Sequence, residues 1–143
     1  MKDSAAVIPA AGVMFAVALC LAADAEGDAS KVQSLHADLI TPASDALFQA
    51  ESKPPVTAAQ WTSIASRAAD LVRAAKALES MESVKGQTQW FQFARALAEA
   101  AEQAAQAAQA QNQDALVSAN GDIVSVCEDC HAKYRDGGRS MKE

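Results

Sequence analysis

A short cluster near the C-terminus, Cys127-Glu128-Asp129-Cys130-His131, leaves the chain around it few structural options. Two cysteines three positions apart, followed directly by a histidine, are the attachment signature of a c-type haem. On a helix, positions i and i+3 share one face, so both thiols can reach one edge of a porphyrin while the residue at i+4 turns under the ring. The pattern predicts a helix here and one haem c, bound covalently through Cys127 and Cys130, with His131 as the proximal iron ligand.

Two other chemistries use a Cys-x-x-Cys pair, namely redox dithiols and zinc sites. The only other cysteine is Cys20 and the only other histidine is His36, so a second Cys/His pair for zinc is missing. A thioredoxin-like dithiol would lie within a βαβ pattern, and the sequence shows no strand pattern. The haem interpretation is favoured, and a haem-free dithiol oxidoreductase stays open as an alternative.

The composition indicates one helical domain. The chain has 143 residues, of which 50% are hydrophobic but only 5% aromatic, and alanine dominates the apolar share. Such a composition favours closely packed helices. The formal net charge is −6 and no basic patch is present, so nucleic-acid binding is not expected.

Residues 1–25 are predicted to be a signal peptide. Lys2 precedes an apolar run from Ala5 to Ala23, which ends in Ala23-Asp24-Ala25, a cleavage site of the A-x-A type. The alternative is an N-terminal anchor that keeps the protein at a membrane, because nineteen apolar residues just suffice to span one. In either case residues 26–143 form the exported domain. A periplasmic location agrees with haem attachment outside the cytoplasm.

The first helix of that domain is expected from about Ser30 to Ala50. His36 lies on its apolar stripe, one turn after Val32 and one turn before Ile40. A histidine in such a place is either a core residue bonded to a backbone carbonyl or, where a haem must be coordinated, an iron ligand. Pro42 is expected to kink or restart the helix, with Thr41 as a local cap.

Three further helices are expected. The second opens at a Thr57/Gln60 capping box and runs to about Ser83, and the third begins near Thr88. The fourth begins at Asn112 or Asp114 and ends at Gly137-Gly138. The residues expected on the inner face of the fourth helix are Leu116, Asn120, Ile123, Val124, Cys127, His131 and Tyr134.

Four helices with short connections predict an all-α, antiparallel up-down-up-down bundle that carries the covalently bound haem. In this topology the start of the first helix and the end of the fourth lie at the same end of the bundle. His36 lies about 9 Å, and His131 about 7.5 Å, from that end at the helical rise. The two imidazoles are therefore expected to face each other across one iron.

The sequence resembles the class II c-type cytochromes, which include cytochrome c′ and its low-spin relatives. One matching stretch runs from Cys127 through Tyr134-Arg135, and the other is Val32-Gln33-Ser34-Leu35-His36 leading to Pro42-Ala43-Ser44-Asp45. The resemblance covers the chain after the leader, although the middle matches only in helix layout. It implies that Arg135 pairs with a haem propionate and that Tyr134 packs behind the proximal histidine. It also makes a homodimer an expectation.

One position departs from the family pattern. Low-spin members typically carry a methionine ligand where this chain has His36, and cytochrome c′ carries a non-ligating apolar residue there. The imidazole predicts bis-histidine ligation by His131 and His36, with a lower reduction potential than Met/His ligation gives.

With both axial positions filled, the haem has no open site, so outer-sphere electron transfer is expected and enzyme activity is not. The main alternative is a five-coordinate, cytochrome c′-like protein that binds nitric oxide or carbon monoxide. The redox protein partners are not indicated by the sequence.

Overall fold

The computed structural model describes residues 29–81 and 87–135. The first helix spans residues 29–52 in three stretches: residues 29–35 are α-helical, η1 (His36–Ile40) is π-helical, and α2 (Thr41–Ser52) is α-helical. It is followed by α3 (Ala58–Glu79), α4 (Thr88–Gln109) and α5 (Gln113–Tyr134). The predicted leader, the turn at Gly86 and the helix end at Gly137-Gly138 lie outside the described residues.

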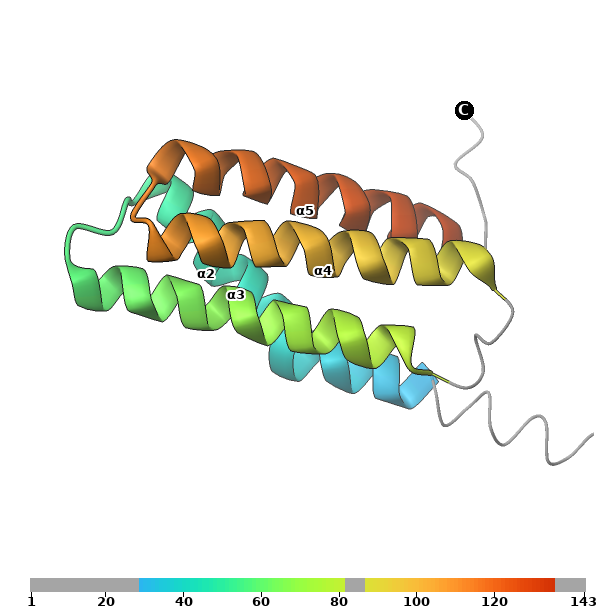
Figure 1. The fold of residues 1–143 in the computed structure, drawn as a ribbon. Helices are drawn as coiled ribbons and strands as arrows, with labels where there is room; N and C mark the ends of the chain where they lie inside the picture. Colours follow the sequence, from blue (N-terminus) through green and yellow to red (C-terminus); the bar gives the residue numbers. More distant parts are fainter. Residues whose placement is uncertain (1–28, 82–86, 136–143) are drawn as a thin grey trace, which may run out of the picture.

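The described residues form four packed helices and contain no strand, which confirms the all-helical prediction. Figure 1 shows that each helix runs opposite to the one before it, so the start of the first helix and the end of α5 lie at the same end of the bundle. α4 packs against both α3 and α5, and the first helix packs against α3 and, through α2, against α5. This arrangement places the two predicted histidine positions at one end.

Local sequence signals determine where α3 and α5 begin. The Thr57 hydroxyl accepts a hydrogen bond from the Gln60 backbone N–H, and the Gln60 side chain accepts one from the Thr57 N–H, which confirms the capping box. The side chain of Asn112, and not Asp114, caps α5 by accepting from the Ala115 N–H. α3 ends at Glu79, about one turn before the predicted end near Ser83, which itself lies outside the described residues.

Alanine builds most of the contact between α3 and α4. Every buried residue of α4 is alanine except Leu97, and α3 contributes the fully buried Ala68, Ala74 and Ala75. Small side chains let two helix backbones approach closely, and they lose little conformational entropy on burial. The predicted tight packing of alanine-rich helices is therefore found in this pair.

Polar side chains join the first helix to α5. Asn120 is 1% exposed, and its Nδ2 donates to the carbonyl of Leu47 at 2.9 Å. Gln113 Nε2 donates to the carbonyl of Ala50 at 3.0 Å. Because a buried amide without a partner costs about 1–3 kcal/mol, these bonds favour one register of α5 against α2.

One position on the inner face of α5 was predicted wrongly. Val124 is 39% exposed, while Val126 packs partly buried against the core. The inner stripe of α5 is narrow at this point because only the first helix and α4 flank it, so the residue beside the stripe faces solvent. Leu116, Asn120 and Ile123 are buried as predicted.

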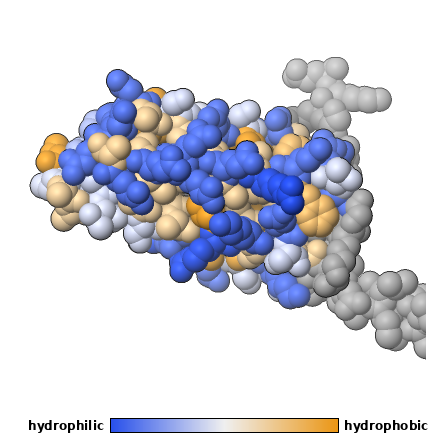
Figure 2. Space-filling view, viewed as in Figure 1, coloured by the Kyte–Doolittle hydropathy of each residue, from blue (hydrophilic) through white to orange (hydrophobic). Residues whose placement is uncertain are grey.

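The visible surface is mainly hydrophilic, with single apolar side chains between charged ones (Figure 2). The ion pairs Lys76–Glu102 and Arg95–Glu79 cross between α3 and α4. Among the described residues, no helix has both the length and the apolar character needed to cross a membrane. The predicted leader is not among those residues.

Candidate functional site

His36 and His131 meet at the end of the bundle where the first helix begins and α5 ends. Their Nε2 atoms lie 3.3 Å apart although the residues are 95 positions apart in the chain. The ring centroids are separated by 5.5 Å and the ring planes are tilted by 36°. Both side chains are half-buried. The structure thus brings together the two histidines that the helix-length argument placed at similar depth.

A backbone bond orients the His36 ring. Its Nδ1 lies 2.9 Å from the carbonyl oxygen of Val32, and since a carbonyl only accepts, Nδ1 carries the proton. Its Nε2 faces the Nε2 of His131, and the tautomers of the two rings decide which nitrogen donates in this contact. A neutral imidazole held through Nδ1 with a free Nε2 is the form that ligates metals. The carbonyl bond expected of a core histidine is present, and it engages Nδ1 while Nε2 faces His131.

The π-helical stretch η1 begins at His36 itself. Its last bond runs from the Thr41 backbone N–H to the His36 carbonyl, five residues apart. Thr41 makes no side-chain cap, so the predicted cap was wrong, whereas the predicted interruption at Pro42 is present as a π-turn. Single turns of π-helix occur mostly inside α-helices and frequently at functional sites.

The two cysteines lie half-buried on α5, one turn and one residue before His131 respectively. Burial raises the pKa of the Cys130 thiol to about 11, with a smaller contribution from charge on Cys127. Burial, followed by the charge of Glu128, also raises the pKa of Cys127. Dithiol oxidoreductases use thiols whose pKa is lowered. The thiols here are therefore held protonated at neutral pH, which disfavours the dithiol alternative.

An aromatic cluster supports the last turn of α5. The Tyr134 ring lies edge-on to Trp90 at 5.1 Å and to Phe93 at 6.2 Å between centroids. The Trp90 Nε1–H donates to the carbonyl of Leu78 at 2.7 Å, which ties α4 to α3. Lys133 lies over the Tyr134 ring and donates to Gln89. These contacts hold the end of α5 that carries the cysteines and His131 against α4.

The remaining predicted site residue, Arg135, caps α5 and is exposed; its backbone N–H donates to the His131 carbonyl at 3.0 Å. Its pairing with a haem propionate stays a prediction, as does the placing of Tyr134 behind a proximal ligand. Glu128 and Asp129 are exposed, as expected for the variable pair inside the motif.

The donor set suits a haem better than a bare metal ion. The described residues contain no group of three or more His, Cys, Asp or Glu that could hold a metal ion. A haem iron takes four ligands from the porphyrin and needs only one or two from protein. With Fe–N bonds of about 2 Å, two axial imidazole nitrogens lie about 4 Å apart. The observed 3.3 Å requires only a small separation of the two rings along the line that already joins them.

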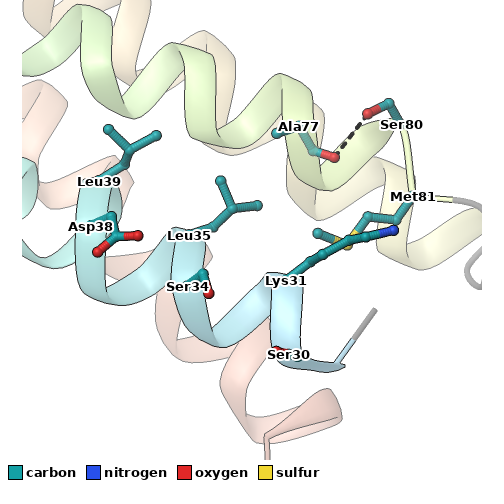
Figure 3. Close-up of a pocket in the computed structure, with 9 residues that line it drawn as sticks. All are labelled: Ser30, Lys31, Ser34, Leu35, Asp38, Leu39, Ala77, Ser80 and Met81. Carbon is teal, nitrogen blue, oxygen red and sulfur yellow. Dashed lines mark hydrogen bonds between the residues drawn. The ribbon is translucent and has the colours of Figure 1, made fainter. Parts of the chain in front are cut away.

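A cavity of about 510 Å³ lies on another side of the first helix, against the end of α3 (Figure 3). Leu35 and Leu39 point into it, and the polar rim includes Lys31 and Asp38. None of the cysteines or histidines of the site lines it. Sequence reasoning missed this cavity because it forms between helices that are distant in the chain, and no single residue pattern marks it.

Comparison of the chain with protein-family models, curated proteins and solved structures finds no match. The resemblance to class II c-type cytochromes stays a prediction from the two sequence motifs.

Proposed function

We propose that this protein is a periplasmic c-type cytochrome that carries electrons. The observation that supports the proposal most strongly is the imidazole pair, whose Nε2 atoms lie 3.3 Å apart and whose α5 member, His131, directly follows the Cys-x-x-Cys pair. Cys127 and Cys130 would hold the haem through thioether bonds, His131 would be the proximal ligand and His36 the distal one. The bound haem would supply a one-electron Fe(III)/Fe(II) couple.

The protein's residues would restrict this site to electron transfer. His36 and His131 would both hold the iron, and a substrate would then find no open iron site. The His36 Nδ1–H bond to the Val32 carbonyl would keep Nε2 deprotonated and aimed at the iron. The predicted leader of residues 1–25 would deliver the chain to the compartment in which the haem is attached.

Visible absorption spectra of the haem-loaded ferric and ferrous protein, with and without carbon monoxide, test the proposal. We expect a low-spin spectrum in both states that carbon monoxide barely alters. The His36→Ala variant should become high-spin in at least one state and should bind carbon monoxide promptly. Gln33→Ala, an exposed change on the same helix, is the matched control and should behave as the wild type.

Reduction potentials refine the assignment of the distal ligand. The His36→Met variant should show a higher potential than the wild type, because Met/His ligation raises it. A wild-type protein that is high-spin and takes up carbon monoxide would contradict bis-histidine ligation and support the five-coordinate, gas-binding alternative. A colourless protein, isolated from cells that attach haem to other c-type cytochromes, would contradict the haem proposal altogether.

A further inference from the structure

The π-turn that begins at His36 has an identifiable cause in Pro42, six residues beyond its start. Pro42 occupies the first turn of α2, directly after η1. Proline has no backbone N–H, and its ring clashes with the carbonyl four residues earlier, which here belongs to Asp38. A continuous α-helix through this position would lose one hydrogen bond and suffer that clash.

The observed geometry avoids both costs. The Thr41 N–H reaches back five residues to the His36 carbonyl, so the ladder closes one residue before the proline. The widened turn no longer requires a bond between position 42 and the Asp38 carbonyl. Pro42 then occupies a place near the start of α2, where a missing N–H costs little.

The π-turn changes the direction in which His36 points. A turn of π-helix contains about one residue more than a turn of α-helix, because its bonds span five residues and not four. Residues before the turn are therefore rotated by about 100°, one residue's share of an α-helical turn, relative to α2. α2 is itself held against α5 by the bond from Asn120 to the Leu47 carbonyl.

Combining these observations, we propose that Pro42 is a positioning residue for the distal histidine. It imposes the π-turn, and the π-turn aims the His36 imidazole at His131. The functional meaning of this inference rests on the proposed bis-histidine ligation. Its structural content concerns the contact between the two imidazoles and can be measured without haem.

The first measurement uses the full-length apoprotein. NMR of the histidine side chains should show a nuclear Overhauser contact between the rings of His36 and His131, as their 5.5 Å centroid separation requires. In Pro42→Ala, which regains an N–H and loses the ring clash, the helix should become regular and the contact should be lost. Pro54→Ala, in the exposed connection before α3, is the proline control and should keep the contact.

A second variant separates rotation from general damage. Adding a deletion of Ala37, an exposed residue inside the π-turn, to Pro42→Ala removes the extra residue from a helix that no longer needs it. This combination should turn His36 back toward α5 and restore the ring contact. Circular dichroism should show equal helix content in all variants. A lost ring contact then reports a rotation of His36 and not unfolding.

The haem-loaded forms give the functional result. Pro42→Ala should lose the low-spin spectrum and bind carbon monoxide, and the combined variant should regain the wild-type behaviour. Retention of the ring contact and of the low-spin spectrum in Pro42→Ala would overturn the inference, as would failure of the deletion to restore them in a folded protein. A wild-type protein that is high-spin while its apoprotein follows the NMR pattern would overturn the proposed ligation and leave the positioning of His36 by Pro42 supported.

Discussion

The contact between α3 and α4 and the contact between the first helix and α5 use different side chains. The first is built largely from alanines, several of them fully buried. The second is joined by the amides of Asn120 and Gln113 at one end and by the two imidazoles at the other. Close packing of small side chains stabilises the contact between α3 and α4, whereas a few directional bonds join the first helix to α5.

The difference distinguishes a contact made by close packing of small side chains from one to which hydrogen bonds between polar side chains contribute. The alanine contact cannot open without loss of close packing, because the small side chains bring the two helix backbones close together. The two imidazoles are only half-buried and meet through a single contact, so we expect their separation to cost less. We therefore expect substitutions at the two contacts to change the free energy of unfolding by different amounts and with a different pH dependence.

Asn120→Asp should cause the largest loss of stability. The introduced carboxylate cannot donate to the Leu47 carbonyl, is buried, and faces Glu51 Oε2 from 3.5 Å. Burial and this neighbour raise its pKa in the folded state, so stability is retained below about pH 4 and is lost as the pH rises. At pH 7 we expect a loss of about 3–5 kcal/mol in denaturant unfolding.

The matched control for this change is Asn112→Asp at the exposed N-cap of α5. Aspartate caps a helix as well as asparagine does, so stability at pH 7 should be unchanged within about 0.5 kcal/mol. An equal loss for Asn120→Asp at pH 4 and pH 7 would show that shape, and not charge, matters at this end of the first helix.

Cys130 should react with iodoacetamide about a hundredfold more slowly in the folded apoprotein than in the unfolded chain at pH 8. Burial raises its pKa from the ordinary 9.0 to about 11, so its thiolate fraction at this pH is smaller by that factor. The rate in the folded protein should rise tenfold per pH unit up to about pH 11. Site-resolved mass spectrometry gives the rate, and equal rates in the two states would refute the burial of this thiol.

Ala74→Leu should lower the free energy of unfolding by about 1–3 kcal/mol, because the fully buried site between closely packed helices cannot take the added carbons without strain. Ala69→Leu, the same change at an exposed position of α3, is the control and should stay within about 0.5 kcal/mol of the wild type. Similar losses for both variants would mean that helix propensity, and not close packing, dominates this pair.

The smallest effect is expected at the histidine end. His36→Ala in the apoprotein removes one neutral hydrogen bond to Val32 and the contact with His131, both half-buried. Its cost should be about 1 kcal/mol in thermal or denaturant unfolding. A loss as large as that of Ala74→Leu would mean that this end is packed as tightly as the alanine contact.

Patterns within single helices predicted much of this structure. The Thr57/Gln60 capping box and the helical character of the segments depend on residues close together in the chain, and both were predicted correctly. The meeting of His36 and His131 could also be predicted, because the rise of a helix is constant and an antiparallel bundle relates the depths of its ends.

Features that depend on neighbouring helices were not predictable from one sequence. Val124 and Val126 are the same residue type, and only the position of α4 and the first helix decides which one is covered. The donation from Asn120 to Leu47 joins residues 73 positions apart. Pro42 indicated an interruption of the helix, but the sequence alone did not distinguish a kink, a restart and a π-turn.

The imidazole contact joins residues 95 positions apart, near the two ends of the described chain. A partly folded form in which residues 29–52 have undocked keeps α3, α4 and α5 together but presents only His131. The imidazole pair would therefore exist only while residues 29–52 are docked on α5. Hydrogen exchange in residues 29–52 would report how often that pair opens.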